Sequence, residues 1–338
     1  MGSVWVFSPR SDLIAFYLPL LIALALVPLV PEASAGQGQV TAGFLLYNLT
    51  VAMMIDHGHV YGTIIPVYFD RWRRRKLSWR AAVVPASVLV VGLILASFSN
   101  LWFSTILAYL AIWHICRQHY GWLVSLERKE LADGQGRWRK LDRLFFFATL
   151  LVPIYCWQSD LSSVKRRYFS DNDMAFALNA DYWPVLHGVY AALVFAFLFS
   201  ALWLVRKEGE RSLGKILFLL ATFFWFYGGL VVASNAIFFW VTLTICHGVS
   251  YHIHINRYWT SSFGGEPPGW FRINRAWKTG AYLVIVTAIS VFILTTRRRW
   301  LGEGEGWRIA LVNFFLISHY VFDAFIWRKG FRGQPAIA

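Results

Sequence analysis

Charged residues and cysteines are both scarce in this chain of 338 residues. Asp, Glu, Lys and Arg make up only 15% of it, whereas 57% is hydrophobic and 18% is aromatic. This composition excludes disordered, collagen-like and coiled-coil proteins, and together with a mean hydropathy of +0.49 it indicates a membrane protein. The three cysteines form no CxxC motif, so the sequence supports neither a disulfide framework nor a zinc ribbon.

Motifs of nucleotide-dependent and serine-dependent enzymes are also missing. No GxSxG, P-loop or dinucleotide-binding fingerprint occurs in its expected context, which argues against an ATP-driven pump. The net charge of +14 does not by itself indicate nucleic-acid binding, because the cytoplasmic loops of a membrane protein carry the same basic excess. We therefore expect no nucleic-acid partner.

Long apolar segments are abundant, and windows of about 20 residues predict about ten membrane-spanning helices. They lie near residues 12–31, 40–66, 81–98, 101–124, 143–158, 183–205, 213–233, 235–256, 278–296 and 307–327. The expected fold is all-α, a polytopic transmembrane helix bundle that forms a single integral membrane domain over residues 1–338. A short fifth span and a tight break near Ser234 leave nine or eleven spans as alternatives.

Basic residues are concentrated on one side of this topology. The loops after the second, fourth, sixth and eighth spans, with Arg10 and the C-terminal tail, hold 24 of the 32 basic residues. Because such loops are retained in the cytoplasm, both termini are predicted to be cytoplasmic, in a bacterial-type inner membrane whose lipids surround the protein. An alternative is that residues 1–35 are a cleaved signal peptide ending in a small-residue motif.

Histidine is the residue type with the most informative distribution, because ionisable side chains within a bilayer are costly and are usually functional. Eight of the nine histidines fall in the second, fourth, eighth and tenth spans: His57, His59, His114, His119, His247, His252, His254 and His319. Together with Asp56 and Asp323 they occupy the second half of each span, so the sequence predicts that they share one depth near the cytoplasmic leaflet. The ninth, His187, lies near the outer end of the sixth span and is interpreted as a structural hydrogen-bonding residue.

Helical spacing suggests which of these groups can point together. His319 and Asp323 are an i,i+4 pair, and Asp56 and His59 are an i,i+3 pair. Neutral imidazoles with carboxylates form sites for iron, zinc, manganese or copper. The sequence therefore predicts that these ten residues form a ligand pool for one or two non-haem iron ions, with zinc, manganese and copper left open. The aspartates are expected to be ligands or acceptors that orient the imidazoles.

Several neighbours of the histidines carry polar groups that could take part in chemistry. Arg117 and Gln118, beside His119, are predicted to hydrogen-bond a bound oxygen species or to balance carboxylate charge. Tyr120, Tyr251 and Tyr320 each adjoin a histidine and could supply a proton. Arg117, Gln118 and Tyr120 are thus the candidate catalytic residues.

The spacing of His114 and His119, HxxxxH, resembles the general plan of membrane di-iron desaturases and hydroxylases, although this sequence has no HxxHH box. A polytopic bundle with scattered intramembrane histidines is also similar to the bacterial Brp/Blh beta-carotene dioxygenases. The strings DHGHV at 56–60, QHYG at 118–121 and HYVFDAFIW at 319–327 resemble histidine-rich bacterial membrane proteins of uncharacterised function. The resemblances imply a class of chemistry and not a particular substrate.

These observations predict a membrane-embedded non-haem iron oxidoreductase or oxygenase that acts on a lipid, isoprenoid or other apolar small molecule. An electron-donor protein is a further expected partner. Two alternatives use the same residues. One is a metal-ion or proton transporter, although a transport pathway should place polar groups at several depths. The other is a haem-binding electron carrier with paired axial histidines.

Overall fold

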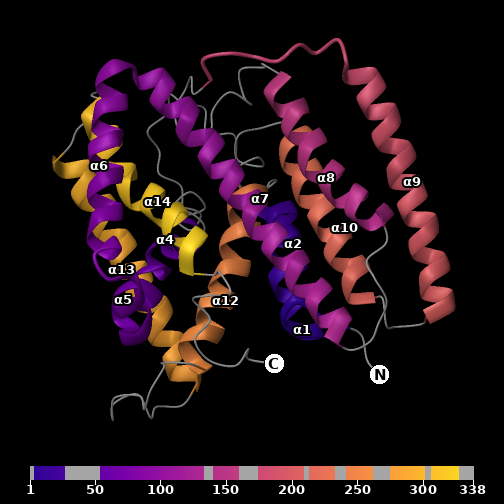
Figure 1. Cartoon of the computed structure of the whole chain (residues 1–338), viewed down its shortest axis with the longest axis horizontal. Helices are drawn as coiled ribbons and strands as arrows, with labels where there is room; N and C mark the ends of the chain where they lie inside the picture. Colours follow the sequence, from indigo (N-terminus) through magenta and orange to yellow (C-terminus); the bar gives the residue numbers. More distant parts are fainter. Residues whose placement is uncertain are drawn as a thin grey trace. The chain divides into compact units, whose positions relative to one another are not determined.

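The computed structural model describes residues 4–26, 54–132, 140–159, 174–208, 213–232, 241–261, 275–300 and 306–326 (Figure 1). Within these ranges every regular element is helical and none is a strand, which confirms the predicted all-α class. Three helical stretches are long and apolar enough to cross a membrane: Arg80–Phe98, Trp183–Lys207 and Leu213–Val232. The full set of ten spans stays a prediction, and the small-residue motif of the alternative signal peptide lies outside the described residues.

The chain divides into two compact units. The first comprises Met1–Gln37 and Ile112–His247, and the second comprises Gly38–Ala111 and Gly248–Ala338. Of the three boundaries between the units, the one after Gln37 lies outside the described residues, and the other two fall within α7 (Asn100–Ala132) and α12 (Cys246–Ser261). Each of these two helices therefore contributes residues to both units. That the whole chain is one membrane domain stays a prediction.

The first unit is built around aromatic side chains. Besides its part of α7 it contains α1 (Pro9–Asp12), η1 (Leu13–Tyr17), α2 (Leu18–Leu26), α8 (Lys140–Ser159), α9 (Trp183–Glu208), α10 (Leu213–Tyr227), η5 (Gly228–Val232) and η6 (Val241–Ile245). Phe145 of α8 stacks on Phe197 of α9 with ring centroids 4.0 Å apart, and α8 also packs beside α10 (Figure 1). The N-terminal helices join this packing through the Trp225 indole, which donates to the Phe16 carbonyl oxygen at 2.8 Å.

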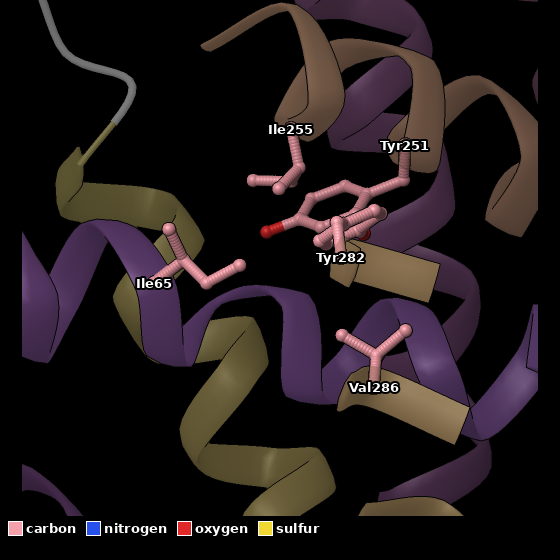
Figure 2. Packing of buried hydrophobic residues seen from close by; sticks show 5 residues of the cluster. All are labelled: Ile65, Tyr251, Ile255, Tyr282 and Val286. Carbon is pink, nitrogen blue, oxygen red and sulfur yellow. The ribbon is translucent and has the colours of Figure 1, made fainter. Parts of the chain in front are cut away.

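The second unit surrounds a short helical segment with longer helices. Its elements are α4 (Gly58–Gly62), η3 (Ile65–Phe69), α5 (Arg71–Leu77), α6 (Arg80–Phe98), α13 (Arg275–Trp300), α14 (Gly306–Ile326) and its parts of α7 and α12. α14 packs against α6 and α4, and α13 against α4. One buried cluster joins Ile65, Tyr251, Ile255, Tyr282 and Val286 from η3, α12 and α13 (Figure 2). These contacts fix α4 between the helices that carry the candidate site.

The segment predicted as the second span is not one regular helix. Residues 54–57 form a π-helical turn before α4, Thr63 lies in a turn after it, and η3 follows as a second π-helical segment. Glycines at both ends of α4 and Pro66 within η3 explain this, since glycine weakens a helix and proline lacks the backbone donor. By contrast α8, α9, α13 and α14 begin and end within three or four residues of the predicted spans.

Candidate metal centre

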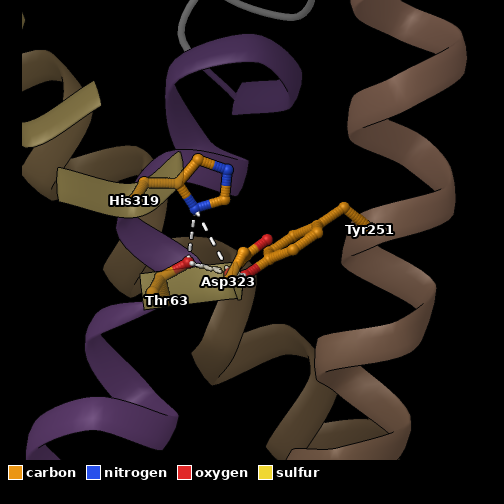
Figure 3. Close-up of polar contacts among 4 residues, drawn as sticks. All are labelled: Thr63, Tyr251, His319 and Asp323. Atoms are coloured by element: carbon orange, nitrogen blue, oxygen red, sulfur yellow. Dashed lines mark hydrogen bonds and ion pairs between the residues drawn. The ribbon is translucent and has the colours of Figure 1, made fainter. Parts of the chain in front are cut away.

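Four polar side chains from three helical segments of the second unit form a continuous hydrogen-bonded chain (Figure 3). The Tyr251 hydroxyl on α12 donates to Asp323 Oδ1 on α14 at 2.8 Å. Thr63 Oγ1, directly after α4, lies 2.6 Å from the Tyr251 hydroxyl and 2.6 Å from His319 Nδ1. The chain therefore runs from the His319 imidazole to the Asp323 carboxylate.

The direction of each hydrogen bond in this chain follows from counting hydrogens. With the single hydroxyl hydrogen of Tyr251 on Asp323, the Thr63 hydroxyl donates to the Tyr251 oxygen at 2.6 Å in preference to Asp323 Oδ1, which lies 3.4 Å away. The Thr63 oxygen can then only accept from the imidazole, which places a hydrogen on His319 Nδ1. In the neutral ring the lone pair is consequently on Nε2, the nitrogen that faces away from Thr63.

His59 on α4 has the same tautomer for a different reason. Its Nδ1 lies 3.2 Å from the Ile55 carbonyl oxygen, which can only accept, so Nδ1 carries the hydrogen. The His59 and His319 rings meet edge to face with centroids 5.1 Å apart, and a ring nitrogen of each lies within 4.8 Å of the other. Both residues are about 2% exposed. The second unit thus presents two buried imidazoles that could hold a metal ion.

Asp323 lies on the protonated side of the His319 ring. Its Oδ1 is 3.7 Å from His319 Nδ1, and it accepts from Tyr251. A carboxylate that receives hydrogen bonds behind a ligating histidine fixes the ring orientation and raises its basicity. Of the two roles predicted for Asp323, this geometry favours the acceptor that orients His319.

In His252, both ring nitrogens are engaged in hydrogen bonds. Nε2 lies 3.0 Å from the Met54 carbonyl oxygen and 3.2 Å from that of Ile55, so Nε2 must donate. Nδ1 then accepts from the Tyr282 hydroxyl at 2.6 Å. With both nitrogens occupied, His252 offers no lone pair to a metal in this arrangement, and we infer that its role is to tie α12 to the turn at 54–57.

Replacing His252 by Ala should separate structural from ligating histidines. We expect the variant to keep its bound metal but to unfold with a free energy lower by about 1–3 kcal/mol, because buried carbonyl and hydroxyl groups lose their partner. Thermal unfolding in detergent and elemental analysis measure the two effects. His254→Ala, on the same helix and partly exposed, is the control. Loss of metal from the His252 variant would instead make His252 a ligand.

Close backbone contact makes this arrangement possible. A Cβ at Gly248 of α12 would lie 2.8 Å from Ile55 Cγ2 and 2.9 Å from the Ile55 carbonyl oxygen. A Cβ at Gly62 of α4 would lie 2.9 Å from the Tyr282 hydroxyl oxygen. Only glycine lets the segments approach this closely, and the approach brings the Ile55 carbonyl within reach of His252.

In the first unit, the histidines predicted as ligands occupy two separate environments. The buried rings of His114 on α7 and His247 on α12 are in edge-to-face contact with centroids 4.9 Å apart. His119 lies elsewhere, with Nδ1 3.3 Å from Thr222 Oγ1 and its ring beside Trp225 and Phe226. Five residues of an α-helix turn through about 140°, so the HxxxxH spacing puts His114 and His119 on different faces. That all eight histidines share one depth concerns both units and stays a prediction.

The candidate catalytic residues of α7 are not buried as the neighbouring histidines are. Arg117 is exposed with its guanidinium over the Trp113 ring, Tyr120 is 42% exposed, and Gln118 is partly buried. Arg117 lies about 200° and Tyr120 about 100° around α7 from His119, and the catalytic role of Arg117, Gln118 and Tyr120 stays a prediction. Tyr251, a secondary candidate, is in the hydrogen-bonded chain.

The remaining predicted ligands lie at less buried positions. Asp56 and His57 are in the π-helical turn before α4 and are partly exposed, as is His254 on α12. Sequence reasoning missed Thr63 and Tyr282. A hydroxyl four residues after His59, on the same helix face, was a usable signal for Thr63. The sequence held no comparable signal for Tyr282, which reaches His252 from another helix.

No protein-family model, curated protein or solved structure matches the chain significantly.

Proposed function

We propose that this protein is a membrane-embedded, metal-dependent oxidoreductase in which His59 and His319 bind non-haem iron through Nε2. The observation that carries the proposal is the hydrogen-bonded chain from Asp323 through Tyr251 and Thr63 to His319 Nδ1. Such a chain of oriented groups behind an imidazole is what a metal-ligating histidine requires.

The chain's own residues have defined tasks in this proposal. When bound, iron held by histidine nitrogens with open positions supplies O2 activation. Asp323 keeps a negative charge behind the His319 ring, while Thr63 and Tyr251 hold the hydrogen on Nδ1 and prevent the ring from turning. His59 is held in a similar way by the Ile55 carbonyl oxygen. The buried positions of both imidazoles limit the access of bulk water.

An apolar substrate is supported by a cavity in the second unit. Its volume is about 350 Å³, within the range of small-molecule sites, and its walls are almost entirely aliphatic. The cavity is lined by α6, α14 and the second unit's part of α7. Gly92, Phe103 and Val321 are among the lining residues. α14 carries both this wall and His319. We therefore propose a lipid, isoprenoid or similar hydrocarbon as the substrate class.

We extend the proposal to the membrane topology. Besides the three stretches able to cross a bilayer, other helices coincide with predicted spans. They include the shorter apolar stretches Thr279–Ile293 and Asn313–Ile326. Ten spans with both termini cytoplasmic would place His59 and His319 in the cytoplasmic half of an inner membrane, where an electron-donor protein could reach them.

The haem alternative is less well supported in the first unit. His114 and His247 are the histidines there whose rings are in contact, and an edge-to-face contact leaves no space for a macrocycle between them. The proposal is tested by elemental analysis of purified protein and by O2 uptake of the iron-loaded protein with a reductant and a membrane-lipid extract. Absence of bound metal after loading would overturn the metal centre, and metal binding without O2 uptake would overturn the oxidoreductase.

The orienting role of Asp323 predicts a partial loss of metal affinity when its carboxylate is removed. Asp323→Asn should weaken metal binding by roughly 10–100-fold without abolishing it, because outer partners of ligating histidines contribute about that much. Competition with a chromophoric chelator measures the affinity. Tyr251→Phe should act in the same direction, since it removes the donor to Asp323. An affinity unchanged in both variants would refute the orienting role.

A further inference from the structure

Helix α5, between the candidate site and α6, has two chemically different faces. Arg73 and Leu77 are buried, whereas Arg74, Arg75 and Lys76 are exposed. Lys and Arg are almost never fully buried unless they are paired, so burying one of these four consecutive basic residues requires a specific partner. The buried residues attach α5 to the second unit, and the exposed basic residues face its surroundings.

The buried face anchors α5 to the rest of the second unit. The Arg73 guanidinium lies 4.2 Å from the centroid of the Tyr258 ring, and Arg73 Nε is 3.7 Å from Asp70 Oδ2. The Tyr258 hydroxyl in turn donates to Asp70. Burial lowers the pKa of Arg73 from its ordinary value, and Tyr258 and Asp70 oppose that shift. Leu77 packs with Phe322 of α14. The exposed residues are therefore presented from a fixed helix.

The exposed face is cationic. Among the described residues of the second unit the carboxylates are Asp56, Asp70 and Asp323, and none forms an ion pair with Arg74 or Arg75. Arg80 adds a further exposed charge beside Trp79, with its guanidinium 5.7 Å from the ring. This face is complementary to an anion.

Aromatic side chains and α6 place this face at the level of lipid headgroups. Phe69 and Trp79, which flank α5, are 63% and 64% exposed. α6 begins at Arg80 and is apolar enough to cross a membrane. Only 11% of its apolar stretch is buried within the protein. An exposed apolar helix needs a lipid environment, and exposed Trp with Arg at its end is typical of the membrane interface.

We propose that the exposed face of α5, formed by Arg74, Arg75, Lys76, Arg80 and Trp79, binds the phosphate of an anionic phospholipid headgroup. The arginines bind the phosphate oxygens, and Trp79 lies against the glycerol and upper acyl region. This inference does not depend on the metal centre. Through Arg73 and Leu77, the bound lipid also fixes the end of the segment that carries His59 and Thr63.

The test measures binding of short-chain phosphatidylglycerol to the full-length protein in a neutral detergent by titration calorimetry. Arg74→Gln with Arg75→Gln should weaken binding roughly tenfold or more, since each basic residue near an anionic lipid contributes about 1 kcal/mol. Arg206→Gln with Lys207→Gln, which removes the same charge from the exposed end of α9, is the matched control and should change little. Wild-type binding should also weaken in 1 M salt.

The comparison ligands distinguish the sources of the phosphate. Short-chain phosphatidylcholine and inorganic phosphate should both bind much more weakly than phosphatidylglycerol. Equal binding of inorganic phosphate would overturn the lipid proposal in favour of a general phosphate site. Equal losses in the α5 and α9 variants, or wild-type binding that is insensitive to salt, would overturn it in favour of diffuse charge or apolar adsorption.

Discussion

Purified His319→Ala protein is expected to contain almost no bound metal. The substitution removes one of the two imidazoles in the second unit that could hold an ion, and with it the ring that the Thr63 hydroxyl orients. Loss of a direct ligand should exceed the roughly 10–100-fold effect of losing an outer partner, so we expect affinity to fall by more than about 100-fold. Elemental analysis after loading with Fe²⁺ and desalting measures it.

His187→Ala is the matched control for this experiment. His187 is partly buried at the start of α9 in the first unit, and its Nδ1 donates to the Trp183 carbonyl oxygen at 3.0 Å. The control should keep the wild-type metal content. Metal retained in the His319 variant would refute the centre, and equal loss from both variants would show that the ion is held by no particular histidine. A thermal unfolding curve for each variant separates loss of ligand from loss of fold.

Gly248→Ala is expected to destabilise the protein by about 1–3 kcal/mol, although Ala is the better helix former. The added methyl carbon would stand 2.8 Å from Ile55 Cγ2 and 2.9 Å from the Ile55 carbonyl oxygen. Backbone cannot give way as a flexible side chain can, so α12 must move from the turn at 54–57. The movement also stretches the His252 hydrogen bonds to that turn. The midpoint of thermal unfolding in detergent should fall accordingly.

Gly280→Ala provides the opposite expectation in the same unit. Gly280 lies within α13, and a Cβ built on it meets nothing within 4 Å. The substitution should stabilise the protein by about 0.4–1 kcal/mol, because alanine lowers the conformational entropy of the unfolded chain. If Gly248→Ala were also stabilising, the close crossing of α12 and the 54–57 turn would be incorrect, and the structural role of His252 would lose its basis.

The long helices could be predicted from composition because a run of apolar residues has few alternatives in a membrane. α6 and α9 begin within one residue of their predicted spans, and α14 extends to the predicted end within one residue. The segment around α4 could not be predicted in the same way. Its glycines and Pro66 permit π-helical turns that the hydrophobicity of the predicted span does not reveal.

The sequence by itself determined that the chain is all-helical and has helices apolar enough to cross a membrane, and it predicted that its histidines and aspartates are the functional residues. It also indicated His319 and Asp323 as partners, since their i,i+4 spacing is a local property of one helix. Only the tertiary structure separated His252 from His59 and His319. For His319 and His252, the ring nitrogen that carries the hydrogen depends on contacts with other segments: the Thr63 oxygen accepts from His319, the Tyr282 hydroxyl donates to His252, and the Ile55 carbonyl oxygen accepts from His252. No pattern along one chain segment encodes those contacts.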